Sequence, residues 1–507
     1  MPISGSITQA WDARVAAGPH RDAIRFANAA WSAAEVDARA DALAADLQER
    51  GVAHGMRIGI YLQNVPLYPV ALLALWKIGA IAVPLNPMYR GAELRRLVDD
   101  SGTSGMVVAE DTDRAELGAT LAGSTVRWVL AEDDVEEVLA ARAGERASYS
   151  AVEPDETAFI TYTSGTTGPP KGALNTHRNF LHAVSNYARW VDLQPGEVSF
   201  AIAPLFHITG LSLNAGIALL NDATLSLAGR FEAQTVLDTF VRHGVTTTIG
   251  SITAFNALLR VPTAGPEHVA TVRALWSGGA PIPPATIEAF RSRFGLYLHN
   301  IWGMTETTGG GIAVPRGAAA PVHEPSGTLS IGVAMQDVEL GVVDDEGNPL
   351  PPGSEGELVF TAPQVVPGYW QNPEATEHAL PGGHLHTGDV AVIDEEGWVY
   401  LVDRKKDQIN AGGFKVWPRE VEDVLYEHPA VFEAAVVGEP DDYRGETVVA
   451  YVSLHDGAEA TPEELVAFSK ERLAAYKYPR KVVVLPALPK TATGKIQRAV
   501  LREGASG

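Results

Sequence analysis

A loop dense in hydroxyls and glycines is the segment of this 507-residue sequence best suited to chemistry. It reads TYTSGTTGPPKGA from Thr161 to Ala173 and follows an apolar run typical of a strand. Glycines let the backbone approach an anion closely, hydroxyls donate hydrogen bonds, and a lysine supplies positive charge. The residues of these three kinds are Thr163, Ser164, Gly165, Thr166, Thr167, Gly168, Lys171 and Gly172. This composition predicts a phosphate-binding loop in place of a plain surface turn.

The loop differs from the Walker pattern of nucleotide-binding proteins. That pattern requires Gly-Lys followed by Ser or Thr. Here Lys171 follows Pro170 and precedes Gly172. The loop must therefore hold phosphate in another structural setting.

Composition limits the partners of this chain. Its formal net charge of -23 repels nucleic acid and anionic lipid surfaces, and no local basic patch offsets this charge. Cysteine is absent, which excludes disulfides, thiolate metal sites and catalysis by a thiol of the enzyme. Any thiol in the reaction must therefore arrive with a substrate.

The sequence shows no signal peptide in Met1 to Arg14, because no basic segment precedes an apolar core there. The most apolar long stretch, Tyr68 to Leu85, is interrupted by Lys77, Gly79 and Pro84. It is typical of a buried helix followed by a strand, not of a membrane span. We therefore expect a cytoplasmic protein.

Alternating helix and strand patterns predict an α/β fold with parallel sheets covered by helices. The first series consists of a helix over 33–50, a strand over 56–62, a helix from about 68, a strand over 80–84, a helix over 92–100 and a strand over 105–109. A second series between 156 and 303 has strand-like runs at 158–162, 198–202, 246–249 and 272–276.

The pattern changes twice in the C-terminal half. Short β-rich segments with turns from about 327 to 402 predict a small antiparallel barrel or sheet. After Lys406 the pattern predicts a smaller α+β unit, with helices at 418–426 and 462–473 and strands at 432–438 and 447–453. The boundary near Lys406 rests on this change alone.

An ordered set of motifs resembles the adenylate-forming (ANL) superfamily, which contains acyl-CoA synthetases, aryl-CoA ligases, peptide-synthetase adenylation domains and beetle luciferases. The glycine-rich loop is followed by PLFHITG, SGGAPI, WGMTE, HTGD, DRKKDQINAGGFKVWPREVE, YKYP and PKTATGKIQR. Each motif alone is weak, but the set covers about the last two thirds of the chain in the family's order.

The resemblance implies a domain organisation. The N-terminal domain, residues 1–405, would contain two doubly wound sheets and a small β-barrel-like subdomain. Residues 406–507 would form a small mobile α+β domain that rotates about a hinge at Lys406. In one orientation it would present Lys495, and in the other it would present Gly412 and Gly413 beside a tunnel for coenzyme A.

The resemblance also assigns catalytic roles. Lys495 in PKTATGKIQR would be the lysine of the adenylation step, although a lysine so close to the C-terminus would otherwise be read as a solvated surface charge. Thr305 would hydrogen-bond a phosphoryl oxygen, and Glu306 would hold Mg²⁺, which favours sparse carboxylate ligation together with substrate phosphates. Without the family context, the Thr-Glu pair would be an ordinary helix N-terminus.

Other motif residues are expected to bind ATP. Trp302 stands where the family usually has tyrosine, and its aromatic face would stack on adenine. Asp389 would accept hydrogen bonds from the ribose hydroxyls, with Arg404 at the same end of the nucleotide. The remaining nucleotide-binding positions are Gly278, Gly279, Ala280, Asn300 and Gly303. A metal pair formed by His384 and His386 with Asp389 is an alternative interpretation of that segment.

The acyl pocket is expected next to the adenylation site. By resemblance, His207 borders it, although a lone histidine in an apolar run is as often a packed core residue. Phe255, Gly309 and Gly310 are expected to line the pocket. The run from Gly309 to Gly311 suggests a roomy or elongated pocket, because it removes side chains.

These features predict an AMP-forming acid–CoA ligase that uses ATP, Mg²⁺ and coenzyme A, with a fatty or a hydrophobic cyclic or aromatic acid as substrate. An amide ligase or a carrier-protein loading enzyme would share the first half-reaction. A catalytically silent nucleotide-binding scaffold is a third interpretation, against which the intact Lys495, Glu306, Thr305 and Asp389 argue. The oligomeric state stays open between monomer and homodimer.

Overall fold

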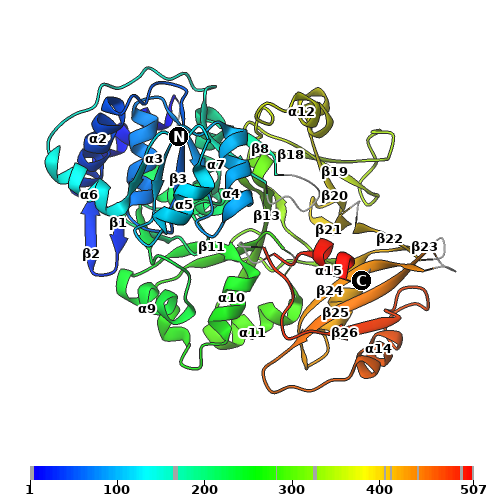
Figure 1. Cartoon of the computed structure of the whole chain (residues 1–507). Helices are drawn as coiled ribbons and strands as arrows, with labels where there is room; N and C mark the ends of the chain where they lie inside the picture. Colours follow the sequence, from blue (N-terminus) through cyan, green and yellow to red (C-terminus); the bar gives the residue numbers. More distant parts are fainter. Residues whose placement is uncertain are drawn as a thin grey trace.

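The computed structural model describes residues 5–163, 170–280, 282–323, 328–404, 407–411, 414–441, 445–491 and 495–504. Figure 1 shows the blue-to-green N-terminal part on the left, an olive-yellow subdomain at the upper right and the orange-to-red C-terminal part at the lower right. Within these described residues the chain forms two large sheets, a four-stranded antiparallel sheet and a separate C-terminal sheet.

The first large sheet has six strands in the order β6-β5-β3-β4-β7-β8. Its strands are β3 (Arg57–Tyr61), β4 (Ile81–Pro84), β5 (Gly105–Val108), β6 (Val129–Ala131), β7 (Thr157–Tyr162) and β8 (Gly172–Thr176). All neighbours are parallel except β7 and β8, which pair antiparallel on either side of the glycine-rich loop. The loop therefore connects the two strands at one edge of this sheet.

Helices cover this sheet as the hydrophobic pattern predicts. They are α2 (Ala33–Glu49), α3 (Leu67–Lys77), α4 (Gly91–Ser101), α5 (Arg114–Leu121), α6 (Glu132–Ala141) and α7 (His177–Trp190). Every residue of α3 is buried, including Lys77, whose ammonium group pairs with Asp37 and Asp41. The apolar stretch near 68–85 is thus a buried helix and a strand. No helix in the described part of the chain is long and apolar enough to cross a membrane.

The second large sheet has nine strands in the order β17-β14-β13-β12-β11-β9-β10-β1-β2. Its strands are β1 (Asp22–Phe26), β2 (Ala29–Ser32), β9 (Val198–Phe200), β10 (Thr224–Leu227), β11 (Thr247–Ser251), β12 (Ala274–Gly278), β13 (Leu298–Met304), β14 (Gly309–Ala313) and β17 (Val333–Ala334). The sequence did not predict that the N-terminal hairpin β1–β2 joins this sheet, where β1 pairs parallel with β10.

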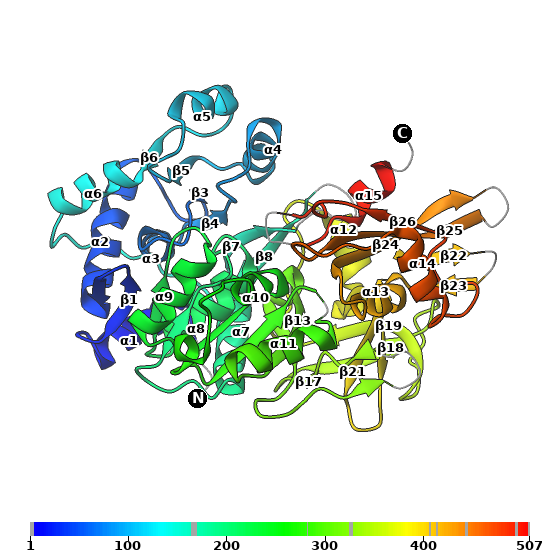
Figure 2. The ribbon, with the colours of Figure 1, turned by 90° about the horizontal axis from the view of Figure 1, so that it is seen from below.

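The helical segments of this part are α1 (Ile7–Ala17), the π-helix η1 (Thr209–Gly216), α8 (Ile217–Leu220), α9 (Ala233–His243), α10 (Ile252–Leu259), η2 (Pro266–Val269), α11 (Pro284–Phe294) and η3 (Thr305–Thr307). In Figure 1, α9, α10 and α11 lie below β11, and in Figure 2, seen from below, they lie in front with the orange-to-red C-terminal part on the right. The short strands β15 (Val322–His323) and β16 (Thr328–Leu329) form a separate pair.

The predicted β-rich subdomain is a four-stranded antiparallel sheet. Its strands, in chain and spatial order, are β18 (Glu339–Val343), β19 (Glu355–Thr361), β20 (Leu385–Ile393) and β21 (Val399–Arg404). The connection between β19 and β20 carries α12 (Pro373–Ala379) and η4 (Pro381–Gly383). This sheet places Asp389 at the end of the large domain that faces the C-terminal unit.

The C-terminal unit is α+β, as the sequence predicts. Its sheet runs β23-β22-β25-β24, with β26 parallel to β25. The elements are β22 (Ile409–Ala411), β23 (Phe414–Val416), α13 (Pro418–Tyr426), β24 (Val431–Asp441), β25 (Gly445–Leu454), α14 (Pro462–Lys470), β26 (Lys481–Val484) and α15 (Arg498–Gly504). The unit has its own hydrophobic core, which includes Val421, Leu425, Val436 and Val452.

Candidate active site

A cavity of about 440 Å³ lies where the second sheet, the β-rich subdomain and the C-terminal unit meet. The large domain lines it with predicted nucleotide-binding residues, namely Gly279, Ala280, Asn300, Trp302, Gly303 and Asp389. The C-terminal unit contributes Thr491 and Lys495 from the opposite side. The structure therefore brings together residues that are more than two hundred positions apart in the sequence.

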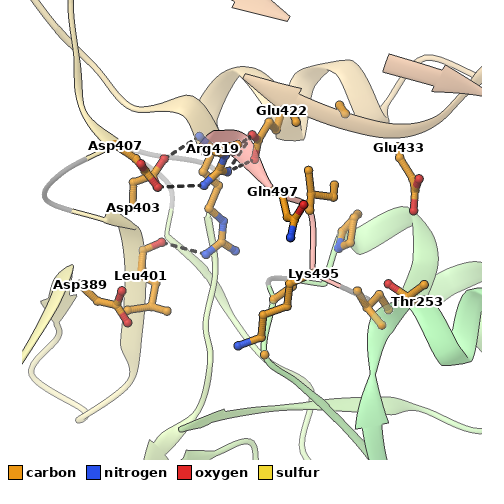
Figure 3. Close-up of a pocket in the computed structure, with 18 of the residues that line it drawn as sticks. Thr253, Asp389, Leu401, Asp403, Asp407, Arg419, Glu422, Glu433, Lys495 and Gln497 are labelled. Atoms are coloured by element: carbon orange, nitrogen blue, oxygen red, sulfur yellow. Dashed lines mark hydrogen bonds and ion pairs between the residues drawn. The ribbon is translucent and has the colours of Figure 1, made fainter. Parts of the chain in front are cut away.

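Lys495 points into this cavity (Figure 3). A Cβ atom added to Gly279 would lie 3.1 Å from Cε and 3.7 Å from Nζ of Lys495. The backbone around the lysine is held by the amide of Thr491, which donates to the Lys495 carbonyl at 2.7 Å, and by the amide of Lys495, which donates to Thr491 Oγ1 at 3.1 Å. The side chain of Lys495 thus reaches the cavity in this orientation of the C-terminal unit.

Trp302 is joined to Asp389 in the same cavity. The indole N–H donates to Oδ2 of Asp389 at 2.9 Å, and both residues are buried. On its other side the indole packs against Phe360, with ring centroids 5.8 Å apart. The hydrogen bond fixes the orientation of the carboxylate. Tryptophan at this position therefore contacts the group expected to bind the ribose.

Glu306 lies in η3 and is only 6% exposed. Tyr369 donates its phenolic hydrogen to Oε1 of Glu306 at 2.5 Å. Thr305, the neighbouring residue of η3, is partly exposed. The carboxylate thus keeps its second oxygen for another partner.

The described C-terminal end of the glycine-rich loop approaches Tyr369. The amide of Thr163 donates to the carbonyl of Lys171 at 3.0 Å, which closes the loop at its base. The ammonium group of Lys171 lies 5.1 Å from the centre of the Tyr369 ring. The intervening residues Ser164, Gly165, Thr166, Thr167 and Gly168 lie outside the described residues.

His207 lies near Lys495, at the start of the segment that leads into η1. Desolvation, followed by the positive charge of Lys495, lowers the pKa of His207 to about 3. The amide of Thr209 donates to Nδ1 at 3.4 Å, so the proton of the neutral ring is assigned to Nε2. His207 is therefore neutral near pH 7.

The structure corrects two expectations about the acyl pocket. Phe255 is fully buried and packs edge-to-face on Phe290, at a centroid distance of 5.7 Å. The face of α10 that lines the cavity carries Ile252, Thr253 and Asn256 instead. Phe255 is not among the residues that line this cavity, and its ring packs into the core against Phe290.

The glycines of β14 do not create open space. A Cβ atom on Gly309 would lie 2.8 Å from Ser212 Oγ, and one on Gly310 would lie 2.5 Å from Cδ1 of Ile301. These glycines permit close packing of η1 and β13 against β14. Gly278 likewise passes close to the carbonyl of Ile301, at 2.9 Å from an added Cβ. The expectation of a roomy pocket at these positions is therefore not supported.

A cluster of ionised groups joins the end of β21 to the C-terminal unit. Arg419 donates from its backbone amide to Oδ2 of Asp403 and from its guanidinium to the carbonyl of Leu401, both at 2.9 Å. Arg498 forms a bidentate contact with Glu422 and lies 3.7 Å from Asp403. Figure 3 shows this cluster beside Lys495.

The cluster and Tyr369 were missed by sequence reasoning. Arg419 lies in the motif PREVE, and Arg498 lies in the motif GKIQR. A charged residue inside such a motif is the signal from which the cluster could have been predicted. Tyr369 gave no comparable signal. Lys406, Gly412 and Gly413 lie outside the described residues, as does the side chain of Arg404, so the hinge and tunnel assignments stay predictions.

The alternative metal site is not formed. His384 contacts Thr361, and His386 lies 3.6 Å from Glu357. Across the described ranges there is no group of three or more His, Asp or Glu side chains suited to hold a metal ion.

The fold and the cavity define an enzyme of the adenylate-forming class. The family model described as AMP-binding enzyme matches residues 11–370, and the model described as AMP-binding enzyme C-terminal domain matches residues 420–495. The chain belongs to the AMP-binding enzyme family. The predicted α/β fold with a smaller C-terminal domain is thereby confirmed.

Similar proteins indicate the same reaction. A feruloyl-CoA synthase of an Amycolatopsis species is 36% identical over 96% of this chain and 97% of its own length. A long-chain-fatty-acid–CoA ligase of Escherichia coli is 34% identical over 93% of this chain and 90% of its own length. The structure of o-succinylbenzoate CoA synthetase from Bacillus subtilis with an acyl-adenylate has a TM-score of 0.87, 31% identity and 99% coverage of both chains.

This chain is an acid–CoA ligase. It uses ATP to convert a carboxylic acid to its adenylate and then transfers the acyl group to coenzyme A. The prediction of an acid–thiol ligase is confirmed, and the silent scaffold is no longer needed to explain the motifs.

Proposed function

We propose that adenylation takes place in the cavity that contains Lys495, Asp389 and Trp302. The observation that supports this proposal is the contact of the Lys495 side chain with Gly279, in a cavity that also exposes Asp389 and Trp302. In this arrangement Trp302 stacks on adenine and Asp389 accepts hydrogen bonds from the ribose. Lys495 then lies at the phosphate end of the nucleotide.

The reaction needs positive charge at that end. A carboxylate oxygen of the acid attacks the α-phosphorus of ATP, a mixed anhydride forms, and pyrophosphate leaves. Negative charge gathers on the phosphoryl oxygens during this step, and the ammonium group of Lys495 donates hydrogen bonds to them. His207, being neutral, contributes no competing charge beside the acid.

The phosphate end is completed by Thr305, Glu306 and Lys171. Glu306 fits a Mg²⁺ ligand because its carboxylate is buried and one of its oxygens is already held by Tyr369. When bound, Mg²⁺ neutralises part of the charge of the β- and γ-phosphates. Thr305 donates a hydrogen bond to a phosphoryl oxygen, and Lys171 adds a second positive charge from the glycine-rich loop.

The acid is proposed to be a compact aromatic or cyclic acid. Ser212, Leu213 and Ile301 pack against Gly309 and Gly310 of β14, so no space for an acyl chain lies directly beside these two glycines. Feruloyl-CoA synthase and o-succinylbenzoate CoA synthetase, both similar to this chain, are named for aromatic acids. ATP and coenzyme A are cytoplasmic metabolites, so the proposed location is the cytoplasm.

A panel of acids tests the substrate class. Benzoate, a hydroxycinnamate, octanoate and palmitate are incubated with the protein, ATP, Mg²⁺ and coenzyme A, and the thioesters are measured by mass spectrometry. We expect kcat/KM for the best aromatic acid to exceed that for palmitate by at least about 10-fold. One or two unfavourable apolar contacts between an acid and its pocket change kcat/KM by about this factor. Preferred conversion of palmitate would refute the compact-acid proposal and leave the ligase reaction intact.

The hydrogen bond from Trp302 to Asp389 gives a second prediction. Trp302→Phe keeps an aromatic face for adenine but removes the N–H donor. Hydrogen bonds to charged groups contribute about 1.5–3 kcal/mol, so we expect the Kd for ATP to rise about 10-fold in calorimetry. The ATP preference over 2′- and 3′-deoxy-ATP should also shrink, because Asp389 loses its fixed orientation.

The matched control is Trp11→Phe. The indole N–H of Trp11 donates to Oδ1 of Asp37 at 2.9 Å, and neither residue lines the cavity. This variant should bind ATP as the parent protein does. If Trp302→Phe binds ATP and its deoxy analogues with unchanged affinities, Trp302 does not position Asp389.

A further inference from the structure

Tyr369 connects two parts of the proposed phosphate site that lie far apart in the sequence. Its hydroxyl donates to Oε1 of Glu306 at 2.5 Å. The ammonium group of Lys171 lies 5.1 Å from the centre of its ring. One side chain thus contacts the carboxylate proposed to hold the metal and the cation of the phosphate-binding loop.

The backbone holds Tyr369 firmly in this position. Tyr369 forms an antiparallel bridge with Ala173, and the amide of Trp370 donates to the carbonyl of Gly172 at 2.7 Å. The amide of Leu174 donates to the carbonyl of Gly368 at 3.0 Å. Residues 368–370 therefore extend the first sheet beyond its edge strand β8, directly after the glycine-rich loop.

A second set of contacts ties the same segment to η3. The amide of Val366 donates to the carbonyl of Glu306 at 2.9 Å. The amide of Tyr369 donates to Oγ1 of Thr376 at 2.9 Å, and its ring packs with Val366 and Ala173. The phenol is thereby fixed relative to Glu306 by both backbone and side-chain contacts.

The environment keeps the phenol a donor. Tyr369 is 7% exposed and Glu306 is 6% exposed, so both polar groups need a partner. The hydroxyl of Tyr369 satisfies one oxygen of the Glu306 carboxylate.

We propose that Tyr369 is a positioning residue for adenylation, which aims the free oxygen of Glu306 at Mg·ATP and restrains Lys171 beside the phosphates. This inference rests on the proposed role of Glu306 as the metal ligand. Groups that hydrogen-bond a metal ligand orient it, and their loss typically lowers metal affinity or activity by about 10–100-fold. Tyr369 itself does not contact the reacting atoms.

The test uses Tyr369→Phe in the full-length protein. This variant keeps the ring beneath Lys171 and removes only the hydroxyl. Calorimetry measures the Kd for ATP in excess Mg²⁺, the Kd for ATP with EDTA, and the Mg²⁺ concentration that gives half-maximal tightening of ATP binding. We expect the Mg²⁺ requirement to rise about 10-fold, whereas the Kd for metal-free ATP stays within about twofold.

Tyr400→Phe is the matched control, because the Tyr400 hydroxyl also donates to a carboxylate, Oδ2 of Asp394, at 2.9 Å. It should leave the Mg²⁺ requirement unchanged. An unchanged Mg²⁺ requirement in Tyr369→Phe would overturn the proposal, and so would equal weakening of ATP binding with and without the metal, which indicates a general structural defect.

Glu306→Gln separates this inference from the proposed function. If Glu306→Gln raises the Mg²⁺ requirement and Tyr369→Phe does not, Glu306 holds the metal and the positioning role of Tyr369 is wrong. If neither variant changes the Mg²⁺ requirement, the assignment of Glu306 as metal ligand fails first.

Discussion

The rate of adenylation should fall about 10²–10³-fold in Lys495→Ala. Removal of one hydrogen-bond donor to a developing negative charge usually lowers the rate by this factor. The variant should still convert a supplied acyl-adenylate and coenzyme A to the thioester at close to the parent rate. We expect the two half-reactions to respond differently because Lys495 approaches the proposed nucleotide pocket from the C-terminal unit, beside Gly279. Pyrophosphate release reports the first half-reaction, and mass spectrometry of the thioester reports the second.

Lys481→Ala is the control for this experiment. Lys481 belongs to the same C-terminal unit, its side chain is 53% exposed, and its nearest acidic partner is Glu439 at 3.4 Å. This variant should retain both half-reactions. Equal loss of both half-reactions in Lys495→Ala would show that the lysine is not confined to adenylation.

Arg498→Met should destabilise the C-terminal unit by about 3 kcal/mol. Burial opposes the charge of Arg498, but Glu422 and Asp403 outweigh it and raise the pKa of the guanidinium. Removing one partner of a buried ion pair costs about 3–5 kcal/mol, and we take the lower end because the Arg498 side chain is 24% exposed. Glu422 would lose the guanidinium that compensates its burial.

Hydrogen exchange measures this effect locally. Amides of β24 and β25 should exchange about 100-fold faster in Arg498→Met, since each 1.4 kcal/mol is a factor of ten. Arg472→Met is the control, because Arg472 is 38% exposed and lies 3.6 Å from Glu427; it should change stability by less than about 0.5 kcal/mol. Exchange in Arg498→Met that matches this control would show that the cluster does not stabilise the unit.

The motifs that resemble those of the family contain residues that the structure brings together in one cavity, among them Trp302, Asp389 and Lys495. The helix and strand patterns likewise predicted α2 and α13 to within about one residue. Local sequence was sufficient for these helices because each depends on neighbouring residues, whereas the site residues were selected from motifs that resemble those of the family.

Other features depend on long-range packing that no local pattern contains. The pairing of β1 with β10 joins segments about two hundred residues apart. The contact between Tyr369 and Glu306 arises only because residues 368–370 extend the edge of the first sheet. Glycine in sequence is also ambiguous, since Gly309 and Gly310 could open a pocket or permit close packing, and the structure shows close packing.

The relative position of Lys495 and the nucleotide is the most direct test of this account. It can be measured in a crystal structure of the protein with Mg²⁺ and a non-hydrolysable analogue of the acyl-adenylate or ATP. We expect Lys495 Nζ at about 3 Å from an α-phosphoryl oxygen, with Asp389 at the ribose and Trp302 against adenine. A nucleotide bound outside this cavity, or bound in it with Lys495 turned away while the C-terminal unit keeps the orientation described above, would contradict it.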